Sequence, residues 1–273
     1  MLQRILAATD FSAPGRRAVA RAALLARQLD VELVVLHVLP ERSLFDRLFH
    51  RHEVDYSTVA AGAERAVQAD VDDVRSRLGI SARPMVLDGV AHRVIATAGP
   101  ALKADLIVVG ARGEGAPGGS LHALGGTSLE LLNRASMPLL LVRQPVEGQY
   151  YKVLAAVDAT ASSRTVLAWA LQLGAQGAVC EAVHALNIPF TERLQAQGVP
   201  EETLDAYVSE ERERWERELA EIAAQLGATD RITSVVARGH PATVVMREIY
   251  ERQPDLVVAG KRRPGAAEAD RHG

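Results

Sequence analysis

Two stretches of this chain, about 150 residues apart, carry the same pattern of residues. Ile5-Leu6-Ala7-Ala8-Thr9-Asp10 returns as Val153-Leu154-Ala155-Ala156-Val157-Asp158, and the match of residues 89–110 to residues 239–260 needs no gap. The period is too long for a solenoid repeat and indicates a duplicated domain. We expect the first domain over residues 1–144 and the second over residues 150–273, joined near residues 144–148.

Within each half, short apolar runs alternate with segments of helical periodicity. In the first half the pattern predicts strands at 3–9, 31–38, 83–87, 105–109 and 138–142, and helices at 13–29, 57–78, 91–103 and 127–135. This alternation is typical of an α/β domain with a doubly wound parallel sheet and right-handed crossovers.

The second half repeats the pattern but stops earlier. It predicts strands at 152–157, 179–186, 232–237 and 255–259, and helices at 161–175, 201–226 and 241–252. After Gly260 the residues are polar, with no further glycine-rich loop, helix or strand pattern. We therefore expect a second domain that is truncated at its C-terminal end.

A glycine-rich segment follows the apolar run at residues 106–109. Seven glycines fall within seventeen residues: Gly110, Gly113, Gly115, Gly118, Gly119, Gly125 and Gly126. The segment leads into a predicted helix that begins at Thr127, with Ser128 next, where free backbone amides and the helix dipole favour a bound phosphate. The alternative is purely structural, because Thr127 and Glu130 have the spacing of a capping box.

Asp10 ends the first predicted strand. The carboxyl ends of parallel strands face the ligand crevice of an open α/β sheet, which places Asp10, Val38 and Gly110 together. A carboxylate there can accept hydrogen bonds from a ribose or a base amino group. The alternative is that Asp10 acts as an N-cap-like residue before the next helix.

Composition and motifs exclude several classes of protein. The net charge of −3 gives no basic surface for nucleic acid, and no window is apolar enough to span a membrane. The single cysteine, Cys180, and the absence of a leader pattern favour the cytoplasm. No lysine follows the glycine spacing of a P-loop, and His50 and His52 have no third ligand at metal spacing, so we expect no metal site. His37 and His184 are expected to be hydrogen-bonded core residues.

Together these motifs resemble the universal stress protein family in its tandem-domain form. The resemblance is carried by residues 5–12, Leu36-His37-Val38, residues 89–92, residues 105–110, Gly113, Gly126-Thr127 with Glu130, and residues 137–142. It implies sheets in the strand order 3-2-1-4-5, as well as a cytosolic stress-response sensor or adaptor.

The resemblance also implies a ligand and a partner. In the nucleotide-binding branch of the family, the matching positions bind ATP, which carries Mg²⁺, or another adenine nucleotide. Those positions are Thr9, Asp10, Val38, Gly110, Gly113, Gly126, Thr127 and Ser128. Twelve residues separate Gly113 from Gly126, three more than in that branch. Paired domains in the family meet through their fifth strands, so the edge at Leu139–Val142 implies a homodimer or another protein partner.

Two alternatives remain open from the residues. One is a scaffold that binds no nucleotide and acts through protein contacts. The other is a slow ATPase or phosphotransferase, for which Asp10, Arg112, Glu114 and His122 lie near the loop without a recognisable catalytic pattern. Because Asp158 and Gly260 are kept but nothing after them, we expect no second nucleotide site of the family type.

Overall fold

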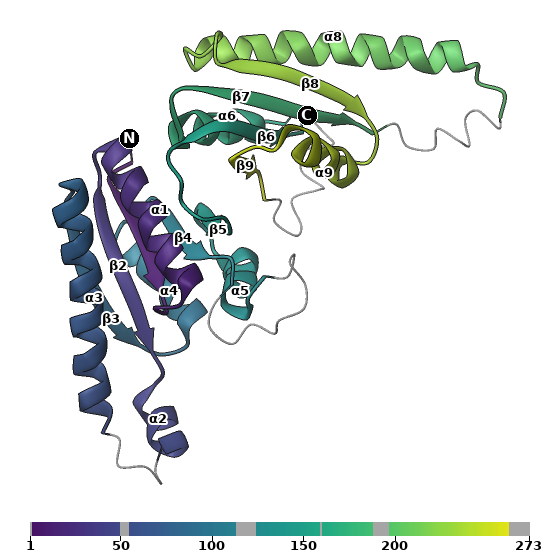
Figure 1. The fold of residues 1–273 in the computed structure, drawn as a ribbon. Coiled ribbons are helices and arrows are strands. Elements are labelled where there is room, and N and C mark those ends of the chain that lie inside the picture. The colour runs from purple at the N-terminus through teal and green to yellow at the C-terminus, as the bar shows by residue number, and fades with distance from the viewer. Residues whose placement is uncertain (1, 50–54, 113–123, 159, 188–196, 262–273) are drawn as a thin grey trace. The chain divides into compact units, whose positions relative to one another are not determined.

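The computed structural model describes residues 2–49, 55–112, 124–158, 160–187 and 197–261. The chain divides into two compact units, Met1–Gly148 and Gln149–Gly273. Each unit is an α/β domain built on a parallel sheet (Figure 1). The prediction of two tandem parallel-sheet domains is confirmed.

The first unit contains a five-stranded sheet in the order β3-β2-β1-β4-β5. Its strands are β1 (Arg4–Thr9), β2 (Glu32–Leu39), β3 (Ala82–Asp88), β4 (Leu106–Gly110) and β5 (Leu139–Val142). Its helices are α1 (Ala13–Leu29), α2 (Arg42–Phe49), α3 (Tyr56–Leu78), α4 (Ala91–Ala101) and α5 (Gly126–Arg134). The strand order predicted from the family resemblance is confirmed.

Helices cover both faces of this sheet. The crossovers of a doubly wound sheet place α1 and α3 on one face, and α4 and α5 pack together on the other. The core on the α4 and α5 side is formed by fully or nearly fully buried residues of the sheet and both helices. They include Leu6, Val34, Ala98, Ile107 and Leu131. The central strands β1, β2 and β4 are mostly apolar because both faces of the sheet are buried there.

The second unit contains a four-stranded sheet in the order β8-β7-β6-β9. Its strands are β6 (Tyr150–Val157), β7 (Gly174–Leu186), β8 (Ile232–Arg238) and β9 (Leu256–Ala259). Its helices are α6 (Ser162–Leu173), α8 (Glu201–Gln225) and α9 (Pro241–Arg252). The strand register repeats that of the first unit, since Leu6 pairs with Val34 and Leu154 pairs with Glu181.

Two elements differ from the sequence-based prediction. Helix α2 was not predicted; it is short, and it is attached through Phe45, whose ring meets that of Tyr56 at 5.3 Å. Strand β7 begins at Gly174 rather than at residue 179, because its first residues pair with the start of β6 across an irregularity in the register.

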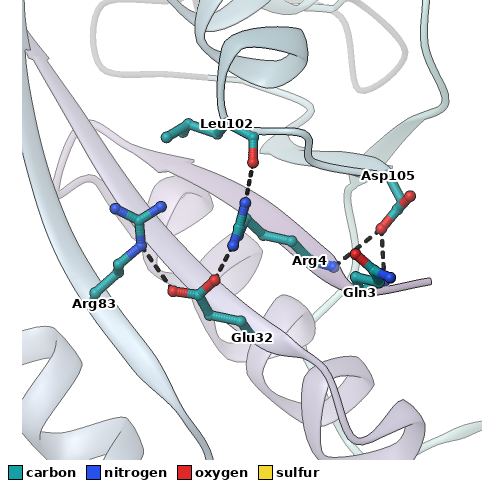
Figure 2. Close-up of polar contacts among 6 residues, drawn as sticks. All are labelled: Gln3, Arg4, Glu32, Arg83, Leu102 and Asp105. Carbon is teal, nitrogen blue, oxygen red and sulfur yellow. Dashed lines mark hydrogen bonds and ion pairs between the residues drawn. The ribbon is translucent and has the colours of Figure 1, made fainter.

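An aspartate fixes the amino-terminal edge of each sheet. In the first unit, Asp105 accepts hydrogen bonds from the backbone N–H groups of Gln3 (2.6 Å) and Arg4 (3.0 Å) (Figure 2). Asp255 accepts the same pair of bonds from Tyr151 and Lys152, both at 2.9 Å. The repeated aspartate is therefore structural, since it satisfies amides at the start of the central strand.

Beside Asp105, Glu32 joins three strands. Its carboxylate pairs with Arg4 at 2.5 Å and with Arg83 at 2.8 Å, as Figure 2 shows. Burial by itself raises the pKa of Glu32, but the hydrogen bonds and positive charges of the two arginines outweigh it and lower that pKa. This cluster belongs to the edge of the sheet opposite the expected ligand crevice.

The second unit replaces part of the apolar core with charged residues. By register and by the repeat, Glu181 occupies the position of Val34, Glu248 that of Ala98 and Arg252 that of Leu102. Arg252 pairs with both Glu181 and Glu248 at 2.7 Å. Arg247 also pairs with Glu248, at 2.8 Å, so the nearly fully buried Glu248 carboxylate has two cationic partners.

Candidate functional site

The expected site residues of the first unit gather where its strand order reverses. Strands β1 and β4 are neighbours, and their connections leave in opposite directions, which opens a crevice at their carboxyl ends. Thr9 ends β1, Gly110 ends β4, and Val38 lies near the end of β2. Gly113, Glu114 and His122 fall outside the described residues, as do His50 and His52.

The turn after β1 is held by its own side chains. Thr9 is buried, and its Oγ1 accepts a hydrogen bond of 3.0 Å from the Phe11 amide. Asp10 Oδ1 accepts hydrogen bonds from the amide of Ser12 (3.1 Å) and from its hydroxyl (2.5 Å). Phe11 adopts a φ of 63°, a conformation that costs energy in a residue with a side chain. These bonds hold the strained turn in place.

Ser12, not Asp10, is the N-cap of α1. Its hydroxyl oxygen accepts a hydrogen bond of 3.2 Å from the Gly15 amide. Asp10 contributes indirectly, because its carboxylate accepts a hydrogen bond from the Ser12 hydroxyl and so orients that hydroxyl. The sequence signal for this cap was present, because a serine stands just before a proline in the first helical turn.

Gly15 allows the Asp10 carboxylate to lie against the helix. A Cβ atom at Gly15 would come within 2.5 Å of Asp10 Oδ1 and 3.0 Å of Thr9 Oγ1. Sequence reasoning missed this glycine because it lies in the helix rather than in the glycine-rich segment. It fixes where the Asp10 carboxylate sits at the mouth of the crevice.

The two strand-end histidines are bonded to neighbouring backbone, as expected. His37 Nδ1 lies 2.9 Å from the Thr9 carbonyl oxygen, and its ring lies 4.4 Å from that of Phe11. In the second unit, His184 Nδ1 lies 3.2 Å from the Val157 carbonyl oxygen. These contacts are structural and use one ring nitrogen in each case.

The glycines that flank the crevice differ in what surrounds them. A Cβ at Gly110 would lie 2.8 Å from the backbone carbon and oxygen of Pro14, so this glycine is required by the close approach of β4 to α1. A Cβ at Gly126 would meet no atom of the described residues within 4 Å. Gly126 is exposed and is not held by a positive φ, so neither packing nor backbone conformation explains it.

Helix α5 begins one residue earlier than predicted, and the capping box is wrong. Its N-cap is Gly125, which has no side chain, so Thr127 lies inside the first turn and its side chain makes no cap bond. Glu130 pairs instead with Arg134 at 2.6 Å, and this hydrogen bond lowers the pKa of Glu130.

The first turn of α5 has three backbone amides that find no acceptor among the residues that the structure describes. The Gly125 amide donates to the Ala111 carbonyl (2.8 Å), and the Leu129 amide donates to the Gly125 carbonyl (2.9 Å). Ser128 is buried, and its hydroxyl donates to the Gly110 carbonyl at 2.7 Å, which joins the helix to the end of β4. Within the described ranges, no residue accepts a bond from the amides of residues 126–128. Such a group of amides is suited to an anion.

The corresponding edge of the second unit is built differently. Asp158 accepts a hydrogen bond of 2.6 Å from the Thr160 hydroxyl, and α6 has no side-chain cap bond. The described residues after β9 are Gly260 and Lys261, and neither is helical. The part of this edge that would correspond to α5 is therefore not among the described elements.

No group of metal-ligating side chains occurs among the described residues. The helices that the structure describes include none that is both long and apolar enough to cross a membrane.

Comparison with known proteins identifies the same family in both halves of the chain. The sequence profile of the universal stress protein family matches this chain twice, over residues 1–143 and 149–269. No curated protein sequence matches the chain significantly.

Two solved structures cover nearly all of the chain. A universal stress protein from Archaeoglobus fulgidus is 17% identical, covers 97% of this chain and 89% of its own, and has a TM-score of 0.69. A putative universal stress protein from Pseudomonas aeruginosa is also 17% identical, covers 97% of this chain and 85% of its own, and has a TM-score of 0.64. Both likenesses concern the fold. With the two profile matches, which span most of its length, the chain belongs to the universal stress protein family.

Proposed function

We propose that this protein is a cytoplasmic stress-response sensor or adaptor that binds an adenine nucleotide, such as ATP with Mg²⁺, in its first domain. The observation that carries the proposal is the set of amides at residues 126–128, which have no acceptor among the described residues and lie beside the space at Gly126. A triphosphate that accepts bonds from these amides also gains from the dipole of α5.

The other side of the crevice supplies the nucleoside contacts. Asp10 offers a carboxylate at the end of β1, and half-buried Val38 offers an apolar surface and backbone groups for adenine. Thr9 sets the backbone between them through its bond to Phe11. In this proposal Gly113 and Thr127 complete the phosphate contacts, and residues 150–273 carry no second site of this kind.

Calorimetric titration with Mg-ATP, AMP and cyclic AMP tests the proposal. We expect saturable binding to the wild-type chain and an affinity loss on the order of tenfold in Gly126→Ala, whose added methyl occupies the phosphate side of the crevice. Gly62→Ala on α3 is the matched control, because its Cβ also meets nothing within 4 Å. If no nucleotide gives a heat of binding, the proposal is refuted. The alternative of a scaffold that acts through protein contacts alone would then be favoured.

The same preparation separates a sensor from an enzyme. A sensor holds Mg-ATP without turnover above the buffer background. Phosphate release that Asp10→Ala abolishes would instead assign a slow ATPase or phosphotransferase.

We further propose that the outer edge of β5 pairs with a second copy of the chain or with another protein. β5 is the last strand of its sheet, and the carbonyls of Pro138 and Val142 bond inward to β4. The amides of Leu139 and Leu141 therefore point outward, along an edge that pairs with no strand in the described ranges. Light scattering after size exclusion should show a dimer that Leu141→Pro converts to a monomer; a wild-type monomer at all concentrations would refute pairing between copies.

A further inference from the structure

A hollow of about 650 Å³ lies in the first unit between α1, α3 and residues 146–148. It is separate from the crevice at the strand ends, since the stripes that line it run along the sides of the two helices. On α1 the lining residues recur at helical spacing and include Val19, Ala20, Ala23 and Leu24. Val74 and Leu78 of α3 face them, so the hollow has an apolar floor.

Small side chains are the reason that the space is open. Ala20 and Ala23 lie on the stripe of α1 that faces α3, where larger residues would fill the gap between the helices. Ala23 is fully buried and Ala20 is exposed, so one forms the floor and the other the rim.

The rim on the side of residues 146–148 is fixed to α1. Arg21, which is itself buried, donates a hydrogen bond of 2.5 Å to the Gly148 carbonyl. This bond holds Glu147 and Gly148 beside the helices, where both line the hollow. The hollow is therefore formed entirely by residues of the first unit.

Asp70 lines the hollow with a buried carboxylate oxygen, Oδ2. In the part of the chain that the structure describes, no donor forms a hydrogen bond with this oxygen. Burial raises the pKa of Asp70, with Arg16 opposing and Asp73 adding to the rise. A buried carboxylate oxygen without a donor is costly, and the cost is removed when a donor arrives.

Two of the arginines that line the hollow bond to groups other than Asp70. Arg77 pairs with Asp73 at 3.1 Å, and Arg16 Nε donates to the Phe11 carbonyl at 3.1 Å. The rim also carries Arg27 and Glu147. The three arginines and three acidic residues of the lining cancel in charge. Of these residues, Asp70 has a buried side-chain oxygen with no donor among the described residues. This arrangement suits a bound cation better than an anion.

We propose that the hollow binds a small amphipathic amine, whose apolar body lies against the alanines of α1 and whose ammonium group donates to Asp70. The inference is independent of nucleotide binding. It assigns a second ligand site, for an arylalkyl or alkyl ammonium compound, to the face of the first domain covered by α1 and α3.

Titration with phenethylamine and with phenethyl alcohol tests the charge. Both probes have the same apolar body, so ligand-observed NMR and calorimetry should show saturable binding of the amine and binding that is weaker by about tenfold or more for the alcohol. Asp70→Asn should remove this preference, while Asp72→Asn, a neighbour outside the hollow that bonds Gln68 and Arg75, should keep it.

Ala20→Leu tests the location. The exposed position tolerates the larger side chain without entering the core, and the added atoms fill the hollow, so amine binding should be lost while the unfolding midpoint is kept. Equal binding of the two probes, unchanged amine binding in Asp70→Asn or in Ala20→Leu, or no saturable binding of the amine would overturn the proposal.

Discussion

The hydroxyl of Ser128 donates a hydrogen bond of 2.7 Å to the carbonyl oxygen of Gly110. Both residues are buried, and the bond ties the first turn of α5 to the end of β4. The position of the amides of residues 126–128 therefore depends on a side chain beside them. This relationship makes the geometry of the proposed phosphate site testable without a ligand.

Ser128→Ala should destabilise the first domain by about 1–3 kcal/mol, because it removes the hydroxyl that donates to the buried Gly110 carbonyl. Urea unfolding measures the loss, and nucleotide titration should show weaker binding as α5 loosens. Thr127→Ala is the control, since Thr127 is exposed and makes no cap bond. Its effect on stability should stay within about 0.5 kcal/mol. An equal loss in both variants would contradict the role given to the Ser128 bond.

Gly110→Ala and Gly126→Ala should have opposite effects on stability. The methyl at residue 110 meets the backbone of Pro14 at 2.8 Å, and backbone cannot move aside as a flexible side chain does. We expect a loss of about 1–3 kcal/mol there. At residue 126 the space is open and the residue is helical, so stability should be unchanged or rise by about 0.5–1 kcal/mol. Thermal unfolding of the two variants is measured without nucleotide. It distinguishes a glycine that packing requires from a glycine that leaves space for a ligand.

Arg252→Met should destabilise the second domain by about 1–3 kcal/mol. The substitution removes the donors to Glu181 and Glu248, and Glu248 remains buried with only Arg247. This expected loss of stability is smaller than that for a fully buried ion pair, because the Arg252 side chain is 35% exposed. Arg217→Met, which breaks an exposed pair with Glu213 on α8, should change stability by no more than about 0.5 kcal/mol. A similar loss in both variants would mean that the buried pairing adds nothing.

Glu248 should make the second domain sensitive to acid. Burial by itself raises its pKa, but the hydrogen bonds and charges of Arg247 and Arg252 outweigh burial and lower the pKa below the ordinary value of 4.5. The unfolded chain therefore binds this proton more readily, so the stabilisation is complete above about pH 4.5 and is lost as the pH falls through the lowered value. Unfolding measured at descending pH should show a steeper decline in the wild type than in Glu248→Gln, and parallel curves would exclude this carboxylate as the cause.

Cys180 should be unreactive in the folded protein. Burial raises the pKa of its thiol to about 12, so at pH 8 only about one molecule in ten thousand carries the reactive thiolate. Because this is the single cysteine, one mass increment reports it. Iodoacetamide should add no mass to the native chain and should modify it fully in guanidinium chloride. Rapid labelling under native conditions would show that β7 opens.

Much of the fold was predictable because the sequence contains two copies of the same domain pattern. Strand ends repeat with their flanking residues, as at Asp10 and Asp158, and each copy supports the assignment of the other. Helix α2 has no such support, since it is a single short element attached through Phe45. The irregular start of β7 was also missed, because its pairing with β6 is set by tertiary contact and not by an apolar run.

The candidate site was predictable in position but not in detail. Strand ends located Thr9, Asp10 and Gly110, whereas the cap at Ser12 and the space reserved by Gly15 depend on distances that spacing does not give. The capping box failed because a threonine and a glutamate three residues apart have that spacing anywhere in a helix. Gly110 is required by packing, whereas Gly126 leaves space. This difference followed only from the atoms around each glycine.

The exchange of Val34 for Glu181 and of Ala98 for Glu248 gives the two halves different responses to their medium. Sulfate and similar salts strengthen the apolar core of the first half, whereas dissolved ions screen the partly exposed charges that hold the second. We therefore expect added sulfate to stabilise the first half more than the second. The two halves of one polypeptide would then differ in how much stability they gain as the surrounding solution becomes more concentrated.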